Sequence, residues 1–75
     1  MNKEKLLEML KELQPGMDFE SSDNFIADGL LDSFDIVQLV SDIETECNIS
    51  ISALDILPEN FQSIDAILTL IKNSN

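Results

Sequence analysis

The chain has 75 residues, 15 of them acidic and four basic, and its formal net charge is −11. A chain this short folds around one small core, because it can bury only about 60% of the surface that it exposes when unfolded. It has no His and a single Cys, whereas acid–base catalysis mostly uses His and metal sites use clustered His, Cys or carboxylates. We therefore expect one domain over residues 1–75 that is not an enzyme and holds no metal.

The charge also limits the partners. Every charged side chain from Met17 to Ile71 is acidic, so nucleic acid and anionic membrane surfaces repel the chain and basic proteins attract it. The lone Cys47 cannot form an internal disulfide, and the sequence has neither an apolar run of membrane-spanning length nor the pattern of a signal peptide. We expect a cytoplasmic monomer without membrane insertion.

Leucines mark one face of a first helix. Leu6, Leu7, Leu10 and Leu13 follow the i, i+1, i+4, i+7 spacing, which predicts a helix from about residue 3 to 13. Pro15-Gly16 cannot continue it, and residues 17–31 are rich in Ser, Asp, Asn and Gly, which predicts a long loop. Loops of this length are usually functional or held by their own apolar side chains. The expected anchors are Phe19, Phe25, Ile26, Leu30 and Leu31.

A second, longer helix is expected to begin at Ser33. Asp32 is a favourable N-cap, and Asp35 would stand third in the helix, where a carboxylate interacts well with the amino-terminal dipole. The helix can run to about residue 46 or 47. At about 100° per residue, one arc forms a core stripe of Ile36, Leu39, Val40, Ile43 and Cys47.

Two apolar residues of this helix fall outside the core stripe. Phe34 and Val37 share their side of the helix with polar residues, namely Gln38, Ser41 and Thr45, with Glu44 nearby. In one interpretation Phe34 packs on the preceding loop and Val37 lies at the core margin. In the other, both belong to a surface that docks on partner proteins. Isolated surface apolar residues need no explanation, but two of them beside a candidate modification site favour docking.

The last third of the chain contains one short and one full helix. Residues 49–52 alternate apolar and polar side chains over too short a stretch for a sheet. Ser52 is expected to cap a single turn over residues 53–56, which Pro58 ends or redirects. Ser63 caps a last helix with a buried stripe of Ile64, Ile67, Leu68 and Ile71, and with Leu70 adjacent. The prediction is an all-α fold of three main helices and one short helix.

Ser33 is the residue that carries most information about function. Its hydroxyl would stand on the exposed first turn of a helix, between the carboxylates of Asp32 and Asp35. Unpaired backbone N–H groups and a partial positive charge at that end favour an anionic phosphate. The hydroxyl is well placed to carry a group joined through a phosphodiester.

The residues around this serine resemble those of acyl carrier proteins. The resemblance lies in Asp28-Gly29-Leu30-Leu31-Asp32-Ser33-Phe34, the Ile49-x-Ile51 segment and the Phe61-x-Ser63-Ile64 helix start, and it covers the chain in length, helix order and acidity. It implies an acyl-carrier-like four-helix bundle. It also implies that Ser33 receives 4′-phosphopantetheine from coenzyme A, which makes the chain a phosphoprotein whose terminal thiol carries an acyl or aminoacyl thioester.

The resemblance implies roles for the neighbouring residues as well. Asp32 and Asp35 would lie beside the phosphate and engage the phosphopantetheinyl transferase. Phe34 and Val37, with Gln38 and Ser41, would dock on partner enzymes, and Glu44 would meet their basic residues. These partners are an acyl- or aminoacyl-activating ligase and downstream synthases or transferases.

The motif is closest to those of D-alanyl carriers and of stand-alone aminoacyl or peptidyl carriers. Phe34 stands where many fatty-acid carriers have Leu, and Asp35-Ile36 replaces the Gly-Thr common in the D-alanyl group. Residues 58–61 resemble peptidyl carriers more. The cargo, and with it a role in fatty acid, polyketide or nonribosomal peptide biosynthesis, stays open.

Two other functions fit parts of the sequence. A calcium-binding helix-loop-helix would explain the acidity and the Asp28-Gly29 pair, but aligning Gly29 with the loop glycine puts Ile26 at a ligand position and Asp35 where a Glu is usual. An acidic interaction module without a prosthetic group would explain the composition alone.

Overall fold

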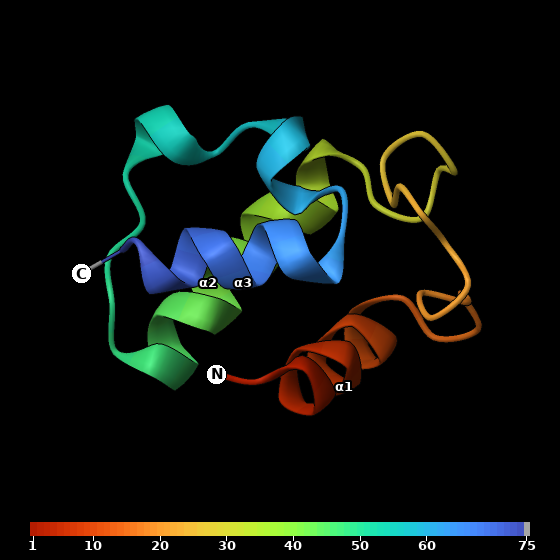
Figure 1. Ribbon diagram of the computed structural model, residues 1–75, viewed down its shortest axis with the longest axis horizontal. Helices are drawn as coiled ribbons and strands as arrows, with labels where there is room; N and C mark the ends of the chain where they lie inside the picture. Colours follow the sequence, from red (N-terminus) through yellow and green to blue (C-terminus); the bar gives the residue numbers. More distant parts are fainter. Residues whose placement is uncertain (75) are drawn as a thin grey trace.

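The computed structural model describes residues 1–74, and these residues form only helices and loops. The three α-helices are α1 (Lys3–Leu13), α2 (Ser33–Cys47) and α3 (Ile64–Lys72), and two short 3₁₀ helices are η1 (Ala53–Asp55) and η2 (Pro58–Phe61). The α-helix bounds agree with those expected from the sequence. α3 packs against α1 and η2, and α2 packs against α1 and η2, in a molecule with extents of 30 × 22 × 19 Å (Figure 1).

Polar side chains cap four of the five helices. Asp32 and Ser63 accept hydrogen bonds from the backbone N–H groups of Asp35 (2.9 Å) and Ala66 (3.0 Å), at the starts of α2 and α3. Ser52 caps η1 in the same way, as expected, and the cap of α1 is Asn2, which the sequence reading did not identify. These bonds satisfy N–H groups that have no partner within the helix, so each helix start is fixed by the local sequence.

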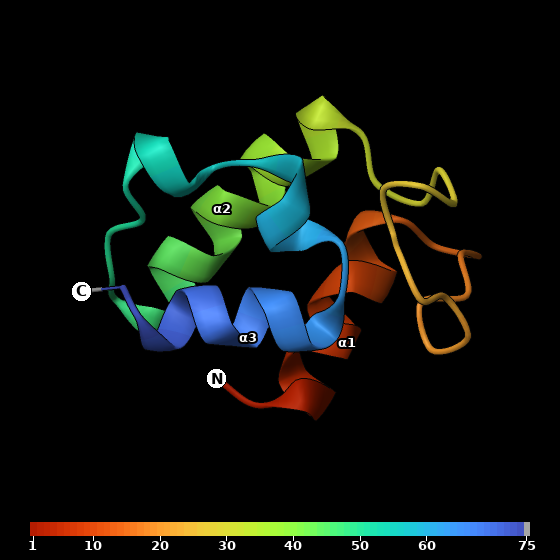
Figure 2. The same cartoon turned by 45° about the horizontal axis from the view of Figure 1, so that its top comes forward.

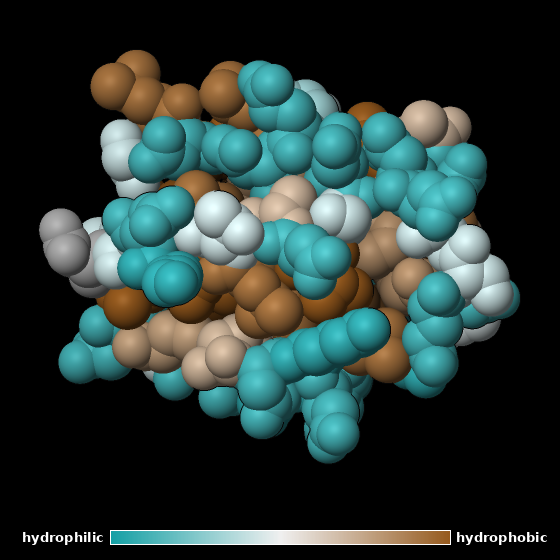
Figure 3. Space-filling view, in the orientation of Figure 1, coloured by the Kyte–Doolittle hydropathy of each residue, from teal (hydrophilic) through white to brown (hydrophobic). Residues whose placement is uncertain are grey.

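The predicted stripe of α2 forms the centre of the core. Ile36, Leu39, Val40 and Ile43 are buried, whereas Cys47 is half-buried at the last turn. On α3 the prediction was partly wrong. Ile67 and Leu70 are buried and Ile64, Leu68 and Ile71 only partly so, because the Leu70 side of α3 faces η2. On the face drawn in Figure 3, hydrophobic surface lies along and beneath α3, between rows of hydrophilic side chains.

The loop between α1 and α2 is held by its own apolar residues, as predicted, although two of the five expected anchors, Ile26 and Leu30, are only partly buried. Phe19 and Phe25 are buried with their rings edge to face at 5.1 Å, and Leu31 is buried just before α2. The backbone N–H of Phe25 donates to the carbonyl of Gln62 (2.7 Å), which ties the loop to the start of α3. The loop projects from one end of the helices (Figure 2), but its buried residues hold its course, so the polypeptide enters α2 from a fixed point.

The segment between α2 and α3 differs from the expectation in one respect. The turn capped by Ser52 is present as η1, but Pro58 begins a further helix, η2, which the sequence reading did not predict. The fixed φ of proline suits the first position of a helix, where no N–H bond is needed. Phe61 of η2 is fully buried, so η2 closes the core over α2 and α3. Among residues 1–74, no helix combines the length and the apolar character that a membrane crossing requires.

Candidate functional site

Ser33 is the first residue of α2, and its side chain is exposed to solvent. The residue two positions before it, Leu31, is buried in the core, and Asp32 adopts an extended backbone that turns the polypeptide into the helix. Ser33 is thus presented outward by a buried anchor on one side and a capped helix on the other. Its hydroxyl is open to reaction with another molecule.

A reciprocal pair of hydrogen bonds fixes this helix start. The Asp32 carboxylate accepts from the Asp35 N–H (2.9 Å), and the Asp35 carboxylate accepts from the Asp32 N–H (3.2 Å). This arrangement is a capping box. Ser33 and Phe34 lie between the two caps, so the backbone that carries both is held at each end.

The two aspartates that flank Ser33 have different surroundings. Asp32 is exposed, while Asp35 is only 6% exposed and its Oδ2 also accepts a hydrogen bond from Nε2 of Gln14 (2.8 Å). The Asp35 carboxylate therefore faces the body of the protein, and Asp32 is the carboxylate beside the serine that an incoming molecule meets.

The apolar side chains of the expected docking face are open to solvent. Phe34 is 76% and Val37 is 64% exposed, so Phe34 does not pack on the preceding loop and Val37 does not lie at the core margin. Gln38 and Ser41 are exposed as well. Exposed apolar side chains in a polar field next to Ser33 are suited to contact with another protein.

Glu44 is less exposed to solvent than the sequence suggests. It is half-buried, and its Oε2 accepts a hydrogen bond from the backbone N–H of Ile51 (2.9 Å). This bond holds the segment after α2 against the helix. Glu44 supplies negative charge at the edge of the expected docking face while one of its oxygens is occupied.

The sequence reading missed Leu54. This residue of η1 is 85% exposed, more than Phe34, and Leu57 nearby is 42% exposed. In Figure 1 η1, η2 and the first turn of α2 lie along the upper edge of the molecule. The signal that could have identified Leu54 is a leucine within a single capped turn, which is too short to have a buried face.

The distribution of charge leaves this edge acidic. The two ion pairs found within residues 1–74 both use lysines of α1, Lys5 with Glu46 (4.0 Å) and Lys11 with Glu20 (2.8 Å). All four side chains are about half-exposed or more, so these pairs contribute little to stability. Within residues 1–74, no lysine forms an ion pair with Asp32 or Asp35, the carboxylates around Ser33.

The positions that a calcium loop would use are engaged in other contacts. Asn24 Oδ1 accepts from the N–H groups of Ile26 and Ala27, and Asp28 Oδ2 accepts from the Ser22 hydroxyl (2.6 Å). In the described residues no three His, Cys, Asp or Glu side chains are grouped so as to hold a metal ion. The calcium interpretation thus has no support in the geometry.

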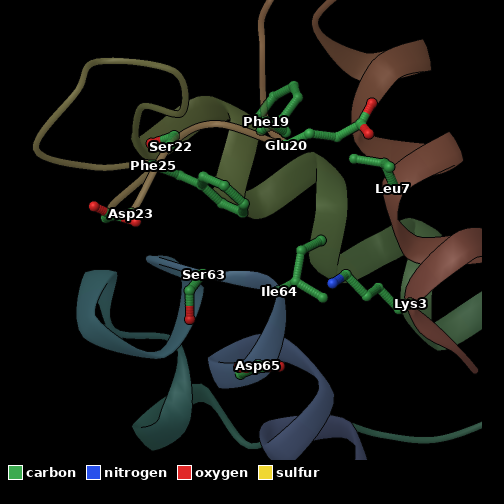
Figure 4. A pocket seen from close by; sticks show the side chains of 10 residues that line it. All are labelled: Lys3, Leu7, Phe19, Glu20, Ser22, Asp23, Phe25, Ser63, Ile64 and Asp65. Atoms are coloured by element: carbon green, nitrogen blue, oxygen red, sulfur yellow. The ribbon is translucent and has the colours of Figure 1, made fainter.

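A hollow of about 490 Å³ lies elsewhere, between α1, the long loop and the start of α3. Figure 4 shows that Lys3 extends toward Ile64 across it, with Leu7, Phe19 and Phe25 around it. None of the residues that the sequence singled out for function lines this hollow. The candidate site is an exposed surface around the start of α2, and such a surface suits attachment and docking.

Comparison of the chain with protein-family models, with curated proteins and with solved structures finds no match. The function must therefore be inferred from the residues of the chain and their geometry.

Proposed function

We propose that the chain is an acyl carrier protein that bears a 4′-phosphopantetheine arm on Ser33 and passes a thioester-bound acyl or aminoacyl group between enzymes. In this proposal the fold is an acyl-carrier-like bundle in which η1 is the short fourth helix. The observation that carries the proposal is an exposed serine at the first position of a capped helix, followed by the exposed Phe34. The resemblance of residues 28–34 to the carrier motif supports the same function.

Attachment is a phosphoryl-group transfer from coenzyme A. The Ser33 oxygen bonds to the phosphorus that carries the pantetheine arm, the pyrophosphate bond of coenzyme A breaks, and the nucleotide part leaves. In this proposal the hydroxyl proton goes to a base of the transferase. The carrier itself performs no chemistry.

The surroundings of Ser33 fit the phosphate of the arm. The group is anionic, and the amino end of α2 presents backbone N–H groups and the positive end of the helix dipole. Because Ser33 is exposed, the arm can extend into solvent without displacing core residues. The exposed Asp32 would lie beside the phosphate and contribute to recognition by the transferase. We propose that Asp35 serves the same recognition through the helix start that it holds.

The exposed apolar residues and the acidic charge suit brief contacts with several enzymes. Phe34 and Val37 would enter apolar pockets, while Gln38, Ser41 and Glu44 would lie against basic and polar groups of the transferase, the activating ligase and the downstream enzymes. Charge complementarity speeds encounter more than it strengthens binding, which matches a carrier that must also be released. We propose a cytoplasmic monomer that binds no nucleic acid.

For the cargo, only the likeness of the motif gives an indication. The run Gly29-Leu30-Leu31-Asp32-Ser33-Phe34 favours an amino acid or peptidyl group over a long fatty acyl chain, by its likeness to D-alanyl and peptidyl carriers. Tethering gives such a group a high effective concentration at each enzyme that docks.

Incubation with coenzyme A, magnesium and a transferase of broad specificity tests the proposal. The intact mass of the wild-type chain should rise by one phosphopantetheinyl group, and that of Ser33→Ala should not change. Ser50→Ala, which alters an exposed serine outside the proposed docking face, should gain the group as the wild type does. A wild-type chain that gains nothing would instead favour an acidic interaction module without a prosthetic group.

A further inference from the structure

The end of α1 is joined to the start of α2 by one side-chain contact. Gln14, the residue that ends α1, donates from Nε2 to Oδ2 of Asp35 at 2.8 Å, across 21 residues of sequence. The same Asp35 oxygen accepts from the Asp32 N–H at 3.2 Å. One buried oxygen thus connects Gln14 directly to the turn that carries Ser33.

Gln14 is itself held in place by its backbone. Its N–H donates to the Leu10 carbonyl (2.9 Å), and its carbonyl accepts from the Met17 N–H (3.3 Å) across the Pro15-Gly16 turn. The side chain is half-buried. The amide therefore presents its N–H to Asp35 from a fixed position, and a residue without that donor would leave the contact unmade.

We infer that Gln14 is a positioning residue for the modification of Ser33, an inference that rests on the proposed carrier function. A transferase must meet the first turn of α2 in its folded form. The Gln14–Asp35 bond keeps the Asp35 carboxylate turned inward, where it closes the capping box around Ser33 and Phe34. Without the bond the turn opens more often, and the fraction of molecules ready for the transferase falls.

This role has a kinetic signature. When only part of a population is competent to bind, the apparent affinity falls by that fraction. Loss of the Gln14 donor should therefore raise the KM of the transferase for this chain by about two- to fivefold. It should leave kcat unchanged, because the turn is fully formed once the transferase has bound it.

The test compares Gln14→Met, which keeps the length of the side chain but has no amide, with Ser63→Ala. Ser63 caps α3 through its bond from the Ala66 N–H, and its loss destabilises the fold without touching α2. Gln14→Leu, which also lacks a donor and adds no charge, serves as a second variant if Gln14→Met folds poorly. Thermal midpoint, KM and kcat for loading, and amide hydrogen exchange at Asp35 are measured for each.

For the Gln14 variant, the inference predicts a higher KM, an unchanged kcat and faster amide exchange at Asp35. For Ser63→Ala, it predicts that the KM and the exchange rate at Asp35 both stay at the wild-type values, even when the thermal midpoint falls by a similar amount. An equal rise of KM in both variants would show a general effect of stability and overturn it. Normal loading of the Gln14 variant with an unchanged KM would overturn this inference alone. A wild-type chain that is never loaded would overturn the carrier function with it.

Discussion

Phe34 and Asp35 are consecutive residues of α2 that differ sharply in exposure, because successive side chains of an α-helix lie about 100° apart around its axis. The Phe34 ring is 76% exposed, whereas Asp35 is 6% exposed and hydrogen-bonded to Gln14 and to the Asp32 backbone. The order is the reverse of what hydropathy alone would favour, since an aromatic side chain stands in water and a carboxylate lies inside. Both placements follow from the capping box, which turns Asp35 inward and leaves the preceding position outward.

Replacement of Phe34 by Ala should separate partner recognition from folding. Because the ring is mostly in solvent, the free energy of unfolding should change by no more than about 0.5 kcal/mol. If the proposed carrier function holds, transfer of a loaded group to a partner enzyme should slow markedly, because the proposed docking surface loses its largest exposed apolar ring. Stability is followed by thermal unfolding and transfer by the rate of thioester loss. Met17→Ala, at an exposed methionine of the long loop, is the control and should affect neither.

Replacement of a buried phenylalanine should have the opposite effect and should destabilise the fold. Phe61 is fully buried in η2, and its replacement by Ala leaves a cavity in the core. The expected loss is about 3–5 kcal/mol, which approaches the whole stability of a small domain. Circular dichroism should show a chain that is largely unfolded near room temperature. A folded Phe61→Ala protein with a thermal midpoint near that of the wild type would contradict the packing described for η2.

Added salt should stabilise the chain. Its net charge is −11, and the two ion pairs seen in residues 1–74 are exposed, so repulsion among carboxylates outweighs attraction. Screening shortens the range of that repulsion, with a Debye length of about 30 Å at 0.01 M salt and about 8 Å at 0.15 M. The thermal midpoint measured in sodium chloride should rise over this range. A midpoint that falls would mean that attractive pairs dominate.

The C-cap residue of α2 allows a test of its backbone conformation. Asn48 adopts a left-handed conformation, with φ of 54°, which most side chains resist. Asn48→Ala should lower the free energy of unfolding by about 1 kcal/mol, while Asn48→Gly should change it by less than about 0.5 kcal/mol. Denaturant titration measures both. Asn73→Ala, at the end of α3 where φ is −90°, is the matched control and should have little effect.

Features set by neighbouring residues could be predicted from the sequence. The starts of α2 and α3 follow from Asp32 and Ser63, whose side chains cap N–H groups within the next turn. The buried stripe of α2 follows from helical periodicity, and periodicity also placed Phe34 and Val37 outside it. The aromatic anchors of the long loop were predictable because a loop of that length needs apolar contacts to stay ordered.

Features set by tertiary contacts could not be predicted. The Gln14–Asp35 bond joins residues from different elements, and nothing in the local pattern distinguishes an Asp35 that faces solvent from one that faces Gln14. Pro58 can end one turn or begin the next. It begins η2 here because that arrangement buries Phe61 against α2 and α3. Burial of Leu70 likewise depends on where η2 packs on α3. The exposure of Leu54 depends on whether another segment covers η1, and local sequence does not reveal that.

Localisation of the modification within the protein tests the central claim most directly. The chain is treated with coenzyme A, magnesium and a transferase, and fragmentation of the intact protein in a mass spectrometer assigns any added group to a residue. The account predicts one phosphopantetheinyl group on Ser33 and none elsewhere. A group found on another side chain, or no group under conditions that fully load an established carrier, would contradict it.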